Sequence, residues 1–154
     1  TAGSADSGRR AAFGYFEGQG EASKYPDDAA RIKKQYFASD DQLVTMIMGG
    51  EIYKPNYEKA WAIGRDLGLP VAAYIVGSLG MAKTFNVLME KKLLRHDNLF
   101  IHKSALPDDA CRATKYAGSA SSTSVRIDMT MLHGTPPLHS QVYRCVPPSP
   151  RSHV

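Results

Sequence analysis

The chain has 154 residues, of which 43% are hydrophobic, and carries a formal net charge of +4 at pH 7. This length suits one domain with extensions, and the hydrophobic fraction excludes disorder of the whole chain. The mild basicity is compatible with nucleic acid, an acidic partner or an anionic membrane surface, but it requires none of them. Two cysteines, Cys111 and Cys145, are too few for a disulfide framework. We expect reduced thiols, with a single bridge as the alternative.

Residues 1–24 are rich in Gly, Ala and Ser, which predicts an extended tail that orders only against another surface. The chain begins at Thr1, and its first ten residues are small, polar and arginine-tipped. These features suggest the remainder of a cleaved organelle presequence. Three aromatic residues of the tail, Phe13, Tyr15 and Phe16, are candidate docking anchors for a partner. The alternative is that their rings pack on their own domain.

Residues 25–103 predict a helical core. Pro26 suits a first helical turn, Ser39 suits an N-cap, and Gly49 with Gly50 suits a helix stop. Apolar residues recur at helical spacing between such signals, and Trp61, Tyr74 and Phe85 are the expected core residues. The expected helices cover residues 26–37, 40–48, 56–67, 70–82 and 84–95.

The longest uncharged run, from Leu67 to Ala82, has 16 residues. A membrane-spanning helix needs about 20 apolar residues, and glycines dilute this run further. We therefore interpret it as a buried helix that begins at Pro70, with a junction between helices near Lys83. A single membrane span over residues 67–83 remains the alternative.

Residues 104–154 predict an extension of mixed character. The segment 108–116 suits a short helix, and alternating apolar residues over 125–131 suit a strand. The end of the chain, from Gly134, contains five prolines and cannot form a long helix. Such an end is expected to wrap over a surface, with Leu138, Val142 and Tyr143 as docking anchors.

No sequence motif of a nucleotide site, a zinc protease or a serine hydrolase occurs, so we expect no catalytic residue and no cofactor. The best metal constellation is Asp128, His133, His139 and Cys145, with His153 beyond, but the ligand spacing matches no compact zinc finger. We interpret His102 as part of a helix end rather than as a proton relay. A small enzyme whose site is formed where His133, His139 and Cys145 converge is retained as one hypothesis.

The segment PNYEKAWAIGRDLGLPVAAYIVGSLGMAKTFNVLMEKKLL (55–94) resembles the helical hairpins of tetratricopeptide and pentatricopeptide repeat proteins. With the residues LVT at 43–45, it also resembles the matrix-side helical-repeat subunit of cytochrome c oxidase. The resemblance implies a mainly α fold of antiparallel helical hairpins, four to five short helices in all. It also implies faces for partner subunits rather than catalytic residues.

These observations together favour a non-catalytic accessory subunit of a large organellar complex. The first choice is a mitochondrial respiratory-chain complex, on the matrix side or associated with the inner membrane, where the chain would contribute to assembly and stability. Its partners would be other protein subunits. The alternatives are an RNA-binding or mitoribosomal helical-repeat protein and a membrane subunit with residues 67–83 in lipid.

Overall fold

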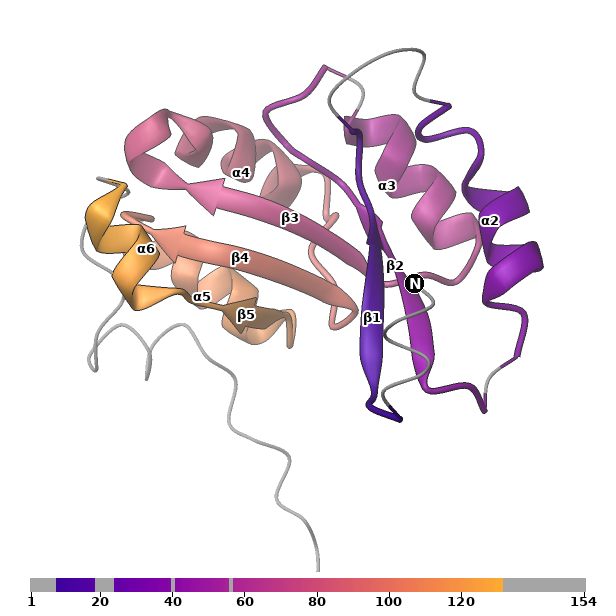
Figure 1. Cartoon of the computed structure of the whole chain (residues 1–154). Helices are drawn as coiled ribbons and strands as arrows, with labels where there is room; N and C mark the ends of the chain where they lie inside the picture. The colour runs from indigo at the N-terminus through magenta and orange to yellow at the C-terminus, as the bar shows by residue number, and fades with distance from the viewer. Residues whose placement is uncertain (1–7, 19–23, 40, 56, 132–154) are drawn as a thin grey trace, which may run out of the picture. The chain divides into compact units, whose positions relative to one another are not determined.

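The computed structural model describes residues 8–18, 24–39, 41–55 and 57–131 (Figure 1). The chain divides into two compact units, Thr1–Ala72 (unit 1) and Ala73–Val154 (unit 2). The boundary between the two units falls within the strand Val71–Val76.

The described residues form five strands, six helices of which one is a short 3-10 helix, and the turns between them. The strands are β1 (Ala11–Tyr15), β2 (Val44–Gly49), β3 (Val71–Val76), β4 (Asn98–Ser104) and β5 (Ala120–Ser122). The helices are α2 (Ala29–Tyr36), α3 (Tyr57–Asp66), η1 (Gly77–Leu79), α4 (Met81–Glu90), α5 (Asp108–Tyr116) and α6 (Val125–Thr130).

The strands follow one another in the sheet order β1-β2-β3-β4-β5, and the sheet is parallel. A helix connects each strand to the next (Figure 1), as parallel neighbours require, because the chain must return to the same end of the sheet. The fold is therefore α/β. The predicted mainly α fold of antiparallel helical hairpins is wrong.

Two of the predicted helices, 40–48 and 70–82, correspond to strands. Four of the six β2 side chains and five of the six β3 side chains are buried. A strand that is covered on both faces reads as a continuous apolar run, without the alternation that marks a half-exposed strand. For this reason, the sequence predicts helices for the segments around LVTMIM and VAAYIV.

Other predicted helices are confirmed. The segment 56–67 contains α3, 108–116 is α5, and 26–37 contains α2. Their sequences alternate apolar and polar residues with a helical period, because each presents only one face to the sheet. The predicted strand over 125–131 is wrong, since α6 occupies it.

The core of unit 1 forms where α3 packs on β2. Trp61 is 1% exposed and its indole Nε1 donates a hydrogen bond to the Gly50 carbonyl at 2.9 Å. A Cβ on Gly50 would lie 2.3 Å from that Nε1, so the indole needs a glycine there. The expectation that Trp61 is a core residue is confirmed.

Strand β1 lies within the segment that was predicted to be a tail. It pairs with β2 in parallel, with Ala11 opposite Val44 and Tyr15 opposite Met48. The Phe13 ring stacks on Phe37 at 5.4 Å between centroids. Aromatic rings of this segment therefore pack on their own unit, which is the alternative that the sequence left open.

The core of unit 2 forms between α4 and β4. The rings of Phe85 and Phe100 meet edge to face, 5.5 Å apart at 75°, and both are fully buried. Cys111 of α5 is also buried and is disulfide-bonded rather than reduced. Tyr74 was expected in the core with Phe85, but it is 40% exposed.

The uncharged run of residues 67–82 forms no continuous helix. It contains the turn before β3, the strand itself, η1 and the first residues of α4. No helix within the described ranges has the length and the apolar character that a membrane crossing requires.

Candidate functional site

The carboxyl end of β4 in unit 2 carries an unusual backbone. His102, Lys103 and Ala105 all have positive φ angles, of 73°, 55° and 54°. Residues other than glycine rarely adopt this conformation, which costs of the order of 1–3 kcal/mol and concentrates at functional sites. The two side chains of interest, His102 and Lys103, consequently leave the strand in directions that a regular strand would not give them.

The imidazole of His102 lies against a buried carboxylate. Its Nδ1 lies 2.5 Å from Asp128 Oδ1, and the Asp128 side chain is fully buried. Asp128 belongs to α6, which lies beyond the carboxyl end of β4 (Figure 1). A buried carboxylate is costly unless it is paired, so the contact with His102 offsets part of the cost of burying Asp128.

Tyr74 adds an aromatic ring to this pair. The centroids of the Tyr74 and His102 rings lie 5.3 Å apart, with the rings tilted by 36°. Every other side chain of β3 is buried, whereas Tyr74 is 40% exposed. The tyrosine ring therefore stands beside the imidazole and remains open to solvent.

Lys103 follows His102 but contacts α5. Its Nζ donates to the Thr114 hydroxyl at 2.6 Å, and that hydroxyl donates to the Cys111 carbonyl at 2.8 Å. Burial lowers the pKa of the Lys103 ammonium to about 8. Lys103 thus helps fix the end of β4 against α5, while its neighbour His102 pairs with α6.

A backbone contact brings the ends of β3 and β4 together. A Cβ on Gly77, the residue directly after β3, would lie 1.9 Å from the Ala105 carbonyl oxygen. Only glycine leaves room for this approach, and it keeps the segment after β4 close to η1.

Unit 1 has its own titratable groups at a strand end. Glu51 follows β2 and is only 5% exposed, and the Tyr25 hydroxyl donates to the Gly49 carbonyl. Burial, and then the Glu51 carboxylate, raise the pKa of Tyr25. In α/β sheets ligands bind at the carboxyl ends of strands, and these groups occupy such an end.

Most site residues suggested by the sequence are not placed by the structure. His133, His139, Cys145, Leu138, Val142 and Tyr143 lie outside the described residues. Within the described part of the chain, no three His, Cys, Asp or Glu side chains are grouped so that they could hold a metal ion. Asp128, which the sequence suggested as one member of that metal constellation, lies against His102.

The sequence interpretation of His102 as a helix end is wrong, since the residue lies in β4. The signal that could have revealed it is the run LFI, which precedes His102, Lys103 and Ser104. A short apolar run followed by polar residues is typical of a buried parallel strand with its functional edge.

No known protein family and no curated protein matches this sequence. Solved structures do match the fold. An adenosine deaminase from Xanthomonas campestris with bound zinc superposes with a TM-score of 0.77 and 17% identity, over 94% of this chain and 37% of that one. An atrazine chlorohydrolase from Arthrobacter aurescens complexed with zinc has a TM-score of 0.66 and 16% identity, over 78% and 29% of the two chains.

An amidohydrolase from a Sargasso Sea environmental sample has a TM-score of 0.61 and 17% identity, over 79% and 28% of the chains. The chain thus spans about a third of the length of these proteins. It shares the α/β, TIM-barrel-like fold of a part of them. In such folds, active sites lie at the carboxyl ends of the strands, which is where His102 is found.

These similarities overturn three sequence-based expectations. The resemblance to helical-repeat hairpin proteins is wrong, because the structural neighbours are amidohydrolase-fold proteins. The assignments to a respiratory-chain complex and to a non-catalytic accessory subunit are also wrong, because the neighbours are hydrolytic enzymes. The error arose because buried strands were taken for the second helices of hairpins.

Proposed function

We propose that this chain forms part of a hydrolytic enzyme whose reaction centre includes His102. The observation that carries the proposal is the buried His102–Asp128 pair, held at the carboxyl end of a strand on a strained backbone. The fold of the structural neighbours supports it, since their names describe a deaminase, a chlorohydrolase and an amidohydrolase.

The pair can act as a general base. With the Nδ1 proton of His102 directed towards Asp128, the other ring nitrogen, Nε2, carries a lone pair. Nε2 then takes one proton from a water molecule while the water oxygen forms a bond to an electrophilic carbon. The same proton is returned to the leaving group as its bond to that carbon breaks, so that the imidazole is regenerated. Asp128 stabilises the imidazolium between the two steps.

The names of two structural neighbours include zinc. The described residues of this chain do not make a zinc site by themselves, because His102 and Asp128 supply only two ligating side chains and no third joins them there. The proposal therefore assigns no step to a metal ion. It concerns what His102, Asp128 and Tyr74 do.

The substrates to test come from the neighbours' names. Adenosine and atrazine are nitrogen heterocycles, and the exposed Tyr74 ring beside His102 offers a flat surface for such a ring. We propose amino- or chloro-substituted nitrogen heterocycles as the substrate class.

The test is the release of ammonia or chloride from adenosine, atrazine and related compounds by the purified protein. We expect turnover by the wild type and a loss of roughly a hundredfold to ten-thousandfold in kcat for His102→Asn and Asp128→Asn. His96→Asn is the matched control, because His96 is an exposed histidine of the same unit.

The alternative role of the pair is purely structural, as an anchor between α6 and β4. In that case the two substitutions lower the free energy of unfolding and leave kcat of the folded fraction unchanged. Folded variants that retain the wild-type rate, or a wild type that hydrolyses none of these compounds, would contradict the proposal.

A further inference from the structure

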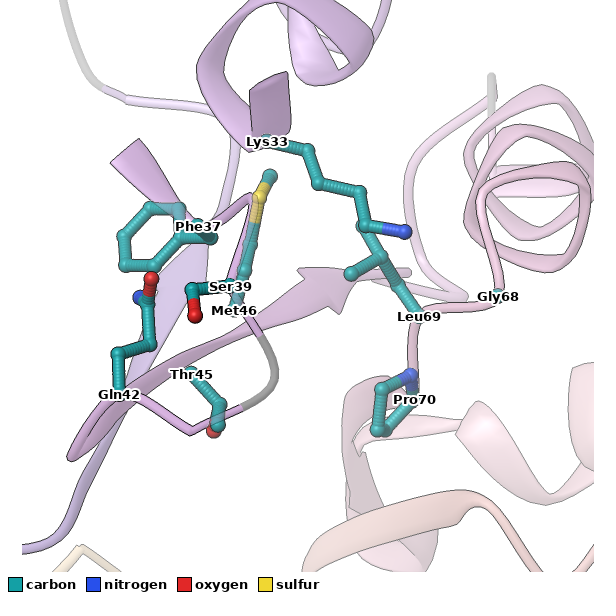
Figure 2. A pocket seen from close by; sticks show the side chains of 9 residues that line it. All are labelled: Lys33, Phe37, Ser39, Gln42, Thr45, Met46, Gly68, Leu69 and Pro70. Carbon is teal, nitrogen blue, oxygen red and sulfur yellow. The ribbon is translucent and has the colours of Figure 1, made fainter. Parts of the chain in front are cut away.

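Unit 1 contains a cavity of about 280 Å³ at the amino ends of β2 and β3, shown in Figure 2. Its walls come from the last turns of α2, the segment that follows, the start of β2 and the turn between α3 and β3. The volume is near the lower end of the range for pockets that bind small molecules.

The apolar part of the cavity lining comes from three buried side chains. Phe37, Met46 and Leu69 are at most 9% exposed, and all three line the cavity. The Phe37 ring is fixed by its stack with Phe13. This wall suits the body of a small ligand, either an aromatic ring or a short alkyl chain.

A cation lies beside this apolar wall. The Lys33 Nζ donates to the Leu67 carbonyl at 2.5 Å, which uses one of its three N–H groups. Figure 2 shows the ammonium beside the turn that carries Leu69. No carboxylate among the residues described in this unit forms an ion pair with Lys33, and the nearby Asp41 accepts a hydrogen bond from Ser39. Among the described residues of unit 1, the ammonium therefore has no carboxylate partner at the cavity.

Polar side chains complete the lining. Gln42 and Thr45 bring an amide and a hydroxyl to the side opposite Leu69 (Figure 2). The Gln42 amide nitrogen is held by the Tyr36 carbonyl at 3.1 Å, so this side chain is fixed in place. These groups add hydrogen-bonding capacity on the side of the cavity away from the ammonium.

We propose that this cavity binds a small organic carboxylate with an apolar body, in which the carboxylate pairs with Lys33. The cavity lies at the amino ends of the strands, away from the end where catalysis occurs in folds of this kind. The ligand therefore does not take part in the reaction. It stabilises unit 1 by binding the folded state, because it contacts α2, β2 and the turn before β3 at once.

The experiment is isothermal titration of the protein with benzoate, and with benzyl alcohol as a neutral ligand of similar size. The variants are Lys33→Gln, which removes the charge, and Lys33→Arg, which keeps it. Lys34→Gln is the matched control, because Lys34 is the exposed neighbour on the same helix and does not line the cavity.

We expect benzoate to bind the wild type, Lys33→Arg and Lys34→Gln alike, and Lys33→Gln at least about tenfold more weakly, as for the loss of a charge-assisted hydrogen bond. Benzyl alcohol should bind the wild type about as weakly as benzoate binds Lys33→Gln. Added salt should weaken benzoate binding. In a nitrogen–proton NMR spectrum, the amide signals of Gln42, Thr45 and Leu69 should shift with benzoate.

Two results would overturn the proposal. One is no binding of benzoate at about 10 mM, where a dissociation constant near 1 mM would give near-saturation. The other is equal affinity of the wild type and Lys33→Gln. If Lys33→Gln does not fold, the NMR shifts decide, and shifts away from the cavity count against it.

Discussion

At the scale of single residues, Lys103 has an ammonium group almost wholly inside unit 2. The side chain is 2% exposed, and burial lowers its pKa from 10.5 to about 8. The folded protein therefore loses this proton near pH 8, while the unfolded chain keeps it until about pH 10.5. Unfolding takes up a proton between these values, so the free energy of unfolding rises with pH in this window, by about 3 kcal/mol in total.

Lys103→Met should remove this dependence. We expect the variant to be more stable than the wild type at pH 7, because no buried charge remains, and the gap should close towards pH 10.5. Urea unfolding at a series of pH values measures it, with Lys83→Met as a control at an exposed position. A wild type and variant whose stabilities run parallel from pH 7 to pH 10.5 would show that Lys103 is not responsible.

Gly77 gives a second prediction at this scale. Its missing side chain leaves room for the Ala105 carbonyl, which a Cβ would meet at 1.9 Å. Because the obstacle is backbone, it cannot rotate away, and Gly77→Ala should cost about 1–3 kcal/mol or more. Gly18→Ala, where a Cβ meets no atom within 4 Å, is the control for chemical denaturation. Equal midpoints for the two variants would contradict the close contact.

At the scale of elements, the helices α2, α3 and α5 could be predicted, whereas the strands could not and α6 was predicted as a strand. The helix α5 shows apolar residues on one side only, so the period of Ala110, Cys111 and Thr114 is visible in the sequence. In β3, the buried residues Val71, Ala72 and Ala73 follow one another without interruption. Such a run fits a buried strand and a buried helix equally well, and the sequence analysis predicts a helix there.

The residues of the candidate site were even harder to predict from the sequence than the strands. His102 and Asp128 belong to a strand and a helix with α5 and β5 between them along the chain. Neither residue has a partner at a spacing that suggests catalysis or metal binding. Their contact depends on the parallel arrangement of β4 and β5, which the sequence interpretation had replaced with hairpins.

The packing of α4 on β4 gives a prediction for an element pair. Phe85 is fully buried against the edge of the Phe100 ring. Phe85→Ala should therefore lower the free energy of unfolding by about 3–5 kcal/mol, as for other large core truncations. Asn86→Ala, the exposed neighbour on the same helix, should change it by less than about 0.5 kcal/mol. Thermal and urea unfolding measure both variants, and a small effect of Phe85→Ala would show that α4 is not part of the core.

At the scale of the whole molecule, each of the two units has buried side chains of its own. Met48 and Trp61 are buried in unit 1, and Phe85 and Phe100 are buried in unit 2. Trp61 bonds to Gly50 of its own unit, and the Phe85 ring meets Phe100 of its own unit. The units could therefore open separately, as regions of unequal stability do in native proteins.

Amide hydrogen exchange tests this separation. Met48→Ala, which truncates a fully buried side chain, should increase exchange in β2 and α3 and leave β4 and α5 unchanged. Phe85→Ala should instead increase exchange in β4 and α5 and leave β2 and α3 unchanged. A uniform increase throughout the described residues in both variants would show that the two cores unfold as one.

The indole of Trp61 has a further consequence. It is the only tryptophan in the chain, and it lies inside unit 1 with its nitrogen bonded to the Gly50 carbonyl. Ultraviolet emission excited at the red edge of protein absorption therefore originates at one position and shifts in colour when water reaches it. Far-ultraviolet circular dichroism, by contrast, sums over the helices of both units. The difference in midpoint temperature between the two melting curves would measure, without any label, how many degrees separate the unfolding of the two units.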